Sequence, residues 1–369
     1  MPSGLHAHLP GHHHTGRSAG IVTALDATVE TPHPAATAEE LAARINSTDF
    51  SGCSATIIGY GGMGRQYLKG LQSLGVGDVH VCSRSQAPLD HLAEMVNVTA
   101  TAGGYPALTE APSSNDLGIV ATPIADLVPA AKHLASIGFR KILIEKPVSL
   151  WSVEIDELNT CLAAHGINAF CAYNRLAYPS LIEARARAAQ DGRITSCVYS
   201  FTEILTDDLE HSHPTDVLAR WGVANSLHPI GMAHSVAGLP MTWSGHRSGA
   251  LAWHPAGSVF VGSGVTEDDI PFSYQADWGS KGRWSVEINT VKASYRLCPL
   301  EKLFTKDSSL FDWEEIPIAV HDSQVKAGFA EQLAAMLDPD IAAMVPLMDL
   351  TQTARLTAFG EDILGYLAP

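Results

Sequence analysis

The sequence predicts an α/β domain followed by an α+β domain. The first is built on a parallel, doubly wound sheet, and the second on a large open, mainly antiparallel sheet. Short apolar segments alternate with helical patterns between residues 53 and 172, which is typical of a parallel sheet. One of these segments, Ile57-Ile58, runs directly into a glycine-rich turn. After residue 190 the segments are rich in Val, Ile, Thr and aromatic residues, with too little chain between them for helical crossovers.

The elements of the first domain follow from the spacing of its apolar residues. Strands are expected at residues 54–58, 78–82, 117–121, 141–145 and 167–172. Helices are expected between them at 63–74, 126–137 and 152–164, and a short helix at 38–46 precedes the first strand. We assign residues 51–173 to this domain and residues 1–50 to an N-terminal extension that is partly flexible.

The second domain is expected to span residues 174–369. Its strand-like segments lie at 194–205, 240–249, 257–265, 272–279, 282–290 and 293–298, and neighbours in such a series pair as antiparallel strands. Residues 325–369 show apolar helical faces, so we expect C-terminal helices that pack back on the first domain. An open sheet face with aromatic and β-branched residues favours a homodimer or homotetramer.

The composition excludes several classes of protein. A net charge of −16 without a basic cluster argues against a nucleic-acid partner, and no run of about 18 apolar residues could span a membrane. Six scattered cysteines without Cys-x-x-Cys spacing favour reduced thiols and a cytoplasmic protein. The leader forms either a metal-binding tract or a flexible segment. We favour the flexible segment and predict no metal site, because no periodic structure would hold its histidines, His6, His8, His12, His13 and His14.

The glycine-rich turn is the most informative motif. The strand at 54–58 leads into Gly-x-Gly-x-x-Gly, and a helical pattern follows with Gly75 as its stop. In a dinucleotide-binding turn the first glycine allows a tight bend and the second lets the backbone approach a pyrophosphate. The third lets helix and strand pack closely. The pattern predicts a Rossmann domain whose cofactor contacts Gly59, Tyr60, Gly61, Gly62, Met63 and Gly64.

The end of the second strand predicts which nicotinamide cofactor is bound. In a dinucleotide fold this strand tip meets the adenosine ribose, where an acid favours NAD and hydroxyls with an arginine favour NADP. The tip here reads Ser83-Arg84-Ser85, and Asp90 lies well past it. The alternative is an ordinary polar turn. We predict that NADP(H) is preferred and that NAD(H) binding is possible.

A charged pair ends the strand at 141–145. Carboxyl ends of parallel strands are where ligands bind in such sheets, and Glu145-Lys146-Pro147 stands at that rim. Lys146 could donate or accept a proton at a substrate oxygen if burial lowers its pKa. Pro147 would fix the backbone, with a cis bond as one option. Taken alone, a lysine at a strand end is more often a solvated rim residue.

Four motifs in this order resemble those of the Gfo/Idh/MocA oxidoreductase family, which includes glucose–fructose oxidoreductase and inositol dehydrogenase. They are the glycine motif, Ala121-Thr122-Pro123, Glu145-Lys146-Pro147 and Ala172-Tyr173-Asn174-Arg175. The resemblance covers most of residues 53–369. It implies NAD(P)-dependent hydride transfer at a sugar or polyol carbon, with Lys146 as a substrate-binding and acid/base residue. Thr122, Pro123 and Glu145 are then expected beside the cofactor, and Tyr173, Asn174 and Arg175 in the substrate cleft.

The resemblance also implies a catalytic histidine, which maps to His228. This residue could bind the reacting hydroxyl or share proton transfer with Lys146. Ala224 and Gly231 stand where family members often carry acids, and Asn225 is expected to supply a polar substrate contact instead. These departures leave open a shifted specificity, a different proton relay or a lost activity.

The leading hypothesis is an NADP(H)-dependent oxidoreductase of the CH–OH/C=O type. It would transfer a hydride to or from a sugar-like carbon of a sugar, polyol or sugar nucleotide, with Lys146 and His228 handling the proton. The first alternative is reduction of a C=N bond in specialised metabolism, because the same apparatus can reduce an imine. The second is a catalytically impaired, dinucleotide-binding regulatory protein, motivated by Ala224 and Gly231.

Overall fold

The computed structural model describes residues 35–111, 116–206, 208–309 and 311–367. These residues belong to one compact unit, Pro32–Pro369. The predicted flexible extension lies largely outside the described residues, and its histidine-rich segment lies wholly outside them. A short helix, α1 (Ala38–Ser47), is the first described element, and Thr37 and Glu40 form a capping box at its start.

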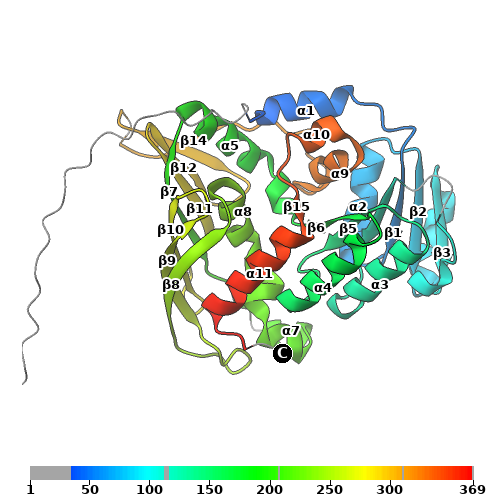
Figure 1. The fold of residues 1–369 in the computed structure, drawn as a ribbon. Coiled ribbons are helices and arrows are strands. Elements are labelled where there is room, and N and C mark those ends of the chain that lie inside the picture. Colours follow the sequence, from blue (N-terminus) through cyan, green and yellow to red (C-terminus); the bar gives the residue numbers. More distant parts are fainter. Residues whose placement is uncertain (1–34, 112–115, 207, 310, 368–369) are drawn as a thin grey trace, which may run out of the picture. The chain divides into compact units, whose positions relative to one another are not determined.

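The first half of the described chain, together with one short strand from its last part, folds into a seven-stranded sheet, sheet A, which confirms the doubly wound α/β prediction (Figure 1). The strand order is β15-β6-β5-β4-β1-β2-β3, and all neighbouring pairs are parallel except β15 with β6. Two strands were not predicted, β3 and the two-residue β15. The strands are β1 (Ser54–Ile58), β2 (Asp78–Ser83), β3 (Val98–Ala102), β4 (Leu117–Val120), β5 (Lys141–Glu145), β6 (Asn168–Ala172) and β15 (Met348–Asp349).

Helices cover both faces of sheet A because its central strands carry apolar side chains on both sides. Ile57 and Leu143 face a core shared with α2 (Gly62–Ser73) and α9 (Phe329–Leu337), whereas Ile58 and Ile144 face the opposite core. That second core is closed by α3 (Ile124–Ser136) and α4 (Ser152–Ala163), with α11 (Leu350–Leu364) packed against α4. The sheet connections also include η1 (Ala87–Glu94) and η2 (Tyr105–Ala107).

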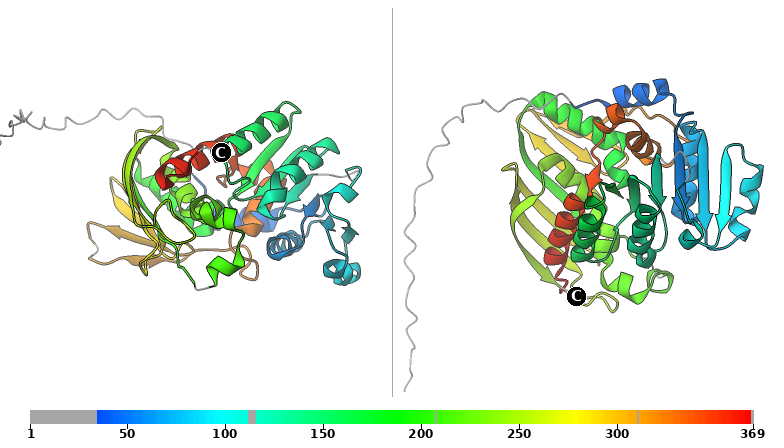
Figure 2. Two further views of the ribbon diagram at one scale, coloured as in Figure 1. Left: turned by 90° about the horizontal axis from the view of Figure 1, so that it is seen from below. Right: turned by 45° about the vertical axis from the view of Figure 1, so that its right-hand side comes forward.

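The second half of the chain forms an eight-stranded sheet, sheet B, in the order β14-β13-β12-β11-β7-β10-β9-β8 (Figure 2). Its neighbours pair as antiparallel strands, as predicted, except that β7 and β10 are parallel. Two of its strands, β13 and β14, were not predicted. The chain leaves β7, crosses through helices and returns by the β8–β9–β10 meander, so β10 enters beside β7 in the same direction. The strands are β7 (Ile194–Phe201), β8 (Pro240–Ser248), β9 (Val259–Thr266), β10 (Pro271–Asp277), β11 (Trp284–Thr290), β12 (Ala293–Leu297), β13 (Leu303–Asp307) and β14 (Glu314–Ile316).

One face of sheet B packs on helices and the other is open in the described part of the chain (Figure 1). The covered face presents Tyr199 and Phe201 of β7 to α8 (Leu227–Ala237), and α11 contacts β8. The open face presents the alternate residues, among them Val198 and Val261, each 41% exposed. The remaining helical segments are η3 (Asn174–Ala177), α5 (Pro179–Asp191), α6 (Leu209–Ser212), α7 (Thr215–Ala219), η4 (Gly222–Ser226) and α10 (Pro339–Ala342).

Two further observations concern the described residues as a whole. None of their helices has the length and apolarity needed to cross a membrane. The six cysteines all lie among these residues and all are free thiols.

Candidate active site

The glycine-rich turn between β1 and α2 has the geometry that its sequence predicts. Gly59 has a φ of +98°, and a Cβ atom there would lie 2.4 Å from the Ala121 carbonyl oxygen, so only glycine fits. A Cβ atom on Gly64 would lie 2.0 Å from the Gly59 carbonyl oxygen, because α2 packs closely on the end of β1. By contrast, Cβ atoms on Gly61 and Gly62 would meet nothing within 4 Å.

The open side of this turn fits a dinucleotide phosphate. Gly61 is the N-cap of α2 and makes no side-chain capping bond, so the helix dipole and its first N–H groups face the open space beside Gly61 and Gly62. Tyr60 is 6% exposed, and its ring lies 5.5 Å from the Arg65 guanidinium carbon. Tyr60 precedes Gly61 and Met63 follows Gly62 in the chain, and the space beside these two glycines is open.

The tip of β2 carries the predicted Ser83-Arg84-Ser85 segment at the same edge of sheet A. Ser83 is half-buried, and the Arg84 and Ser85 side chains are exposed. The Gly104 N–H donates to the Ser83 carbonyl oxygen at 2.9 Å, which fixes the backbone of the tip but leaves its side chains available. Asp90, the nearby acid, already accepts a hydrogen bond from the Gln86 side-chain amide at 2.9 Å.

Lys146 follows β5 and reaches into the second half of the chain. Its Nζ donates to the Ala224 carbonyl oxygen at 2.6 Å. The Lys146–Pro147 peptide bond is cis. Burial lowers the pKa of Lys146 below its ordinary value, and nearby Glu145 and Glu203 oppose that shift while Arg175 adds to it. The Lys146 ammonium is therefore half-buried and loses its proton more readily than an exposed lysine does.

The segment that accepts this bond is a π-helical turn, η4, which runs directly into α8. Glu203, just beyond the end of β7, holds the turn from the other side. Its carboxylate accepts from Asn225 Nδ2 at 2.8 Å and from Ser226 Oγ at 2.5 Å. Glu203 is 4% exposed, and burial raises its pKa while the bonds from Ser226 and Asn225 lower it. The sequence analysis did not identify Glu203.

His228 lies in the first turn of α8, four residues after Ala224. It is 3% exposed, and its Nδ1 has no hydrogen-bond partner in the described structure. Burial holds the pKa of His228 well below its ordinary value, and the positive charges of Arg175, Lys146 and Lys326 lower it further. The imidazole is therefore neutral near pH 7, with one nitrogen that can accept a proton or hydrogen bond.

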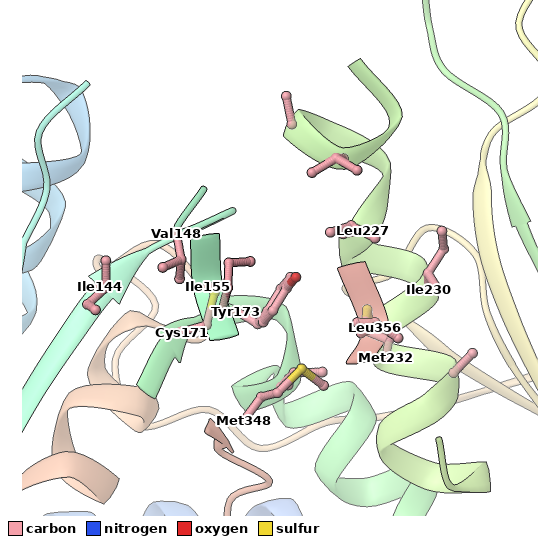
Figure 3. Close-up of a cluster of buried hydrophobic side chains, with 14 of the residues drawn as sticks. Ile144, Val148, Ile155, Cys171, Tyr173, Leu227, Ile230, Met232, Met348 and Leu356 are labelled. Carbon is pink, nitrogen blue, oxygen red and sulfur yellow. The ribbon is translucent and has the colours of Figure 1, made fainter. Parts of the chain in front are cut away.

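Tyr173 joins the Lys146 side of the site to the His228 side. Its ring is fully buried, lies 5.9 Å from the His228 ring and meets it edge-on at 83°. Figure 3 shows Tyr173 among apolar side chains from both sides, with Ile144 and Val148 on one side and Leu227 and Ile230 of α8 on the other. Its hydroxyl has no hydrogen-bond partner in the described structure.

Arg175 forms one wall of a cavity of about 280 Å³ beside these residues. Its guanidinium carbon lies 4.9 Å from the centre of the Trp284 ring, and its buried Nε has no hydrogen-bond partner in the described residues. The cavity is lined by Arg175, Thr202, Glu203, Ile204, Asn225, Arg283, Trp284, Pro299, Leu300 and Glu301. The sequence analysis missed Trp284 and the contribution of sheet B to this cavity.

Three predicted residues make contacts of another kind. Asn174 is 3% exposed and does not line the cavity, because its Nδ2 donates to the Ala327 carbonyl oxygen at 3.2 Å. Glu145 is also buried, accepts a hydrogen bond from the Tyr67 hydroxyl at 2.6 Å and has its pKa raised by burial. Thr122 lies against the glycine turn, since a Cβ atom on Gly59 would come within 3.1 Å of its backbone nitrogen, and its buried hydroxyl lacks a partner.

Comparisons with known proteins relate the N-terminal part to dehydrogenases. A family model for shikimate and quinate 5-dehydrogenases matches residues 40–145, which span the strands and helices around the glycine turn. No curated protein sequence matches the chain.

Solved structures match nearly the whole described fold. UDP-N-acetylglucosamine 3-dehydrogenase GnnA from Acidithiobacillus ferrooxidans is 15% identical with a TM-score of 0.65, over 85% of this chain and 97% of that one. An Agrobacterium radiobacter oxidoreductase in complex with NAD⁺, L-tartaric acid and magnesium is 13% identical with a TM-score of 0.67, over 85% and 95%. The WlbA dehydrogenase from Bordetella pertussis in complex with NADH and UDP-GlcNAcA is 12% identical with a TM-score of 0.63, over 84% and 94%.

At these identities the matches establish the fold alone, and that fold is the one that the resemblance of the four sequence motifs implied. The chain has the fold of the Gfo/Idh/MocA-type oxidoreductases, with a Rossmann-type nucleotide-binding sheet followed by a large, mostly antiparallel second sheet.

Proposed function

We propose that this protein is an NADP(H)-dependent oxidoreductase that transfers a hydride to or from a sugar-like hydroxyl or keto carbon. The observation that carries the proposal is the pairing of Lys146 and His228 across the two halves of the fold. The Lys146 Nζ donates to the Ala224 carbonyl, one helical turn before His228. The positive charge of Lys146 also lowers the pKa of the His228 imidazole. This pairing lies at the carboxyl edge of the sheet that carries the glycine turn.

The chain's own residues hold and move the proton. Lys146 has a lowered pKa, so its ammonium can give a proton to a developing alkoxide, and its amine can take one from an alcohol. His228 is neutral and offers a nitrogen that can hydrogen-bond the same oxygen. A nicotinamide cofactor would supply or accept the hydride. Gly59, Gly61, Gly64 and the α2 N-terminus are the groups that would hold its pyrophosphate.

The preference for NADP(H) rests on the exposed Arg84 and its flanking serines, and it gives a direct test. Calorimetry on Arg84→Ala should show NADPH affinity reduced by about tenfold or more, because a charge-assisted bond to the 2′-phosphate is lost. NADH affinity should stay within about twofold. Arg140→Ala is the matched control. Arg140 directly precedes β5, so it lies at the amino-terminal ends of the parallel strands, whereas Arg84 follows the carboxyl end of β2. Equal loss of both cofactors, or NADH binding preferred by the wild type, contradicts the assignment.

The sugar-like substrate class is supported by the proteins that share the fold. GnnA is named for its action on UDP-N-acetylglucosamine, and WlbA was solved with UDP-GlcNAcA. A screen with NADPH against ketosugars and cyclic imines, and with NADP⁺ against sugars and polyols, separates this proposal from imine reduction. Turnover of imines alone would replace the sugar proposal with its alternative.

The missing family acids do not by themselves favour a catalytically impaired protein. The Ala224 position contributes its backbone carbonyl to Lys146. The Gly231 position faces Leu356, Leu176 and Tyr173, where a carboxylate would be surrounded by apolar atoms. Glu203 supplies a buried carboxylate whose negative charge acts on Lys146 instead.

We also propose that the open face of sheet B is a homo-oligomer interface. This face forms a shallow groove of about 940 Å³ and includes the half-exposed Val198 and Val261. Size-exclusion chromatography with light scattering should give a dimer or tetramer for the wild type and a smaller species for Val261→Arg. Val291→Arg is the control, because this exposed residue lies in the turn between β11 and β12. A monomeric wild type contradicts the proposal.

We also propose a reducing, cytoplasmic setting for this protein, which fits its six free cysteines.

A further inference from the structure

Several cationic side chains lie on the cavity wall or close enough to Arg175 to interact with its charge. Arg175 and Arg283 line the cavity, and the charge of Arg175 lowers the pKa values of Lys146, His228 and Lys326. Like charges brought together in a partly buried site raise the energy of the folded protein unless a counter-charge is supplied.

The carboxylates nearby do not form direct ion pairs with these cations. Among the described residues, no salt bridge within 4.0 Å involves Lys146, Arg175, Arg283 or Lys326. Each of the three facing carboxylates instead accepts hydrogen bonds from neutral side chains. Glu145 is bound by Tyr67, Glu203 by Asn225 and Ser226, and Glu301 by Tyr178 at 3.4 Å. Lys146 already donates to the Ala224 carbonyl, whereas the buried Nε of Arg175 has no acceptor among the described residues.

Arg175 is the cation best placed to receive an acidic group. It lines the cavity of about 280 Å³, which is of a size suited to a small molecule. Its guanidinium lies over the Trp284 ring at 4.9 Å and close to Tyr178 at 5.9 Å, so aromatic contacts fix the plane of the fork. A buried Nε without a partner shows that this donor set is not satisfied within the described chain.

We propose that the substrate carries an acidic group, a carboxylate or a phosphate, which Arg175 binds in this cavity. The inference rests on the proposed function for the reacting carbon, which must lie near Lys146 and His228. A planar, fixed guanidinium favours an oxyanion that can accept two parallel hydrogen bonds. Asn225 and Arg283 are the further donors on the cavity wall. Glu203 and Glu301 also line the cavity, but neither forms an ion pair with Arg175, so a neutral sugar would leave its buried Nε without a charged acceptor.

Calorimetry with simple probes tests the inference without turnover. The full-length protein is titrated with D-glucuronate, D-glucose 6-phosphate, inorganic phosphate and D-glucose, with and without NADPH. Wild-type protein should bind glucuronate or the sugar phosphate at least about tenfold more tightly than glucose, and Arg175→Gln should remove that difference. Arg193→Gln, a change at an exposed arginine between α5 and β7, is the control and should retain it.

The outcomes separate the sources of the anion. Preference for glucuronate identifies a carboxylate substrate, and preference for glucose 6-phosphate identifies a phosphate substrate. Both support the inference. Binding of inorganic phosphate alone, or of glucose as well as the acids, overturns it, as does an Arg175→Gln variant that binds the acids normally. NADPH affinity within about twofold of wild type shows that Arg175→Gln is folded.

The proposed function can fail separately from this inference. If NADPH binds and neutral sugars are turned over as fast as acidic ones, the oxidoreductase proposal stands and the acidic substrate is wrong. If the acids bind through Arg175 but neither NADPH nor NADH binds, the acid site stands and the oxidoreductase proposal is wrong.

Discussion

Lys146→Ala should reduce kcat by about a hundredfold to ten-thousandfold, because proton transfer to or from the substrate oxygen loses its donor and acceptor. NADPH affinity should change by less than about twofold, since the Lys146 Nζ donates to the Ala224 carbonyl rather than to the glycine turn. Stopped-flow measurement of NADPH oxidation at saturating substrate gives kcat, and calorimetry gives the cofactor affinity.

Two further variants separate proton transfer from simple positioning. Lys146→Arg keeps a positive charge and a donor for the Ala224 carbonyl, but guanidinium does not lose its proton, so its kcat should remain low. Lys141→Ala changes a lysine at the start of β5, where its Nζ donates to the Met336 carbonyl oxygen, and should leave kcat unchanged. Near-normal turnover by Lys146→Ala, or recovery by Lys146→Arg, contradicts the proton-transfer role.

The parts of the fold that sequence predicted well are those with strong local patterns. β1, the glycine turn and α2 form one unit in which Gly59 and Gly64 are required by close contacts, so the motif determines the geometry. β3 was missed because its sequence, Val98–Ala102, consists of threonine, alanine and a single valine, with no fully buried residue to create a strong apolar alternation. The parallel pairing of β7 with β10 depends on a long crossover that strand patterns do not encode.

The site was predictable where its residues end strands of sheet A. Lys146 follows β5 and Tyr173 follows β6, so a rule about carboxyl ends of parallel strands places both at one edge. The rule did not reach Glu203, because the strand was predicted over 194–205, which placed this residue inside it, whereas β7 ends at Phe201 in a mainly antiparallel sheet. The stacking of Arg175 on Trp284 could not be found this way, because it joins η3 to β11 across the two halves of the fold.

Glu203 provides a buried carboxylate in a site where Ala224 and Gly231 occupy positions at which the resemblance led us to expect acids. The π-helical turn η4 is bound on one side by Lys146 through the Ala224 carbonyl and on the other by Glu203 through Asn225 and Ser226. The carboxylate therefore positions the backbone that holds Lys146 and leads into His228. Its negative charge also raises the pKa of Lys146, which opposes the effect of burial. We infer that Glu203 is a positioning residue with an electrostatic role.

Glu203→Gln should lower kcat/KM at neutral pH by roughly tenfold or more, because a charged hydrogen-bond network of about 1.5–3 kcal/mol is disturbed. Loss of the carboxylate lets the pKa of Lys146 fall further. In the reduction direction, where Lys146 must carry its proton, the decline of kcat/KM at high pH should begin at a lower pH than in the wild type. Glu210→Gln, at an exposed carboxylate in α6, is the control for removing one negative charge.

In Glu203→Gln the free energy of unfolding at neutral pH should not fall as kcat/KM does, because the variant no longer buries a charged carboxylate. The folded-state pKa of Glu203 is raised by burial, so its contribution to stability is present below the ordinary glutamate pKa and is lost as pH rises through the raised value. Glu203→Gln lacks that loss, so its free energy of unfolding should vary less with pH between the acidic and neutral range, as measured by urea unfolding. A variant that is destabilised at neutral pH while its pH–rate profile keeps the wild-type shape would show that Glu203 serves only to hold the fold.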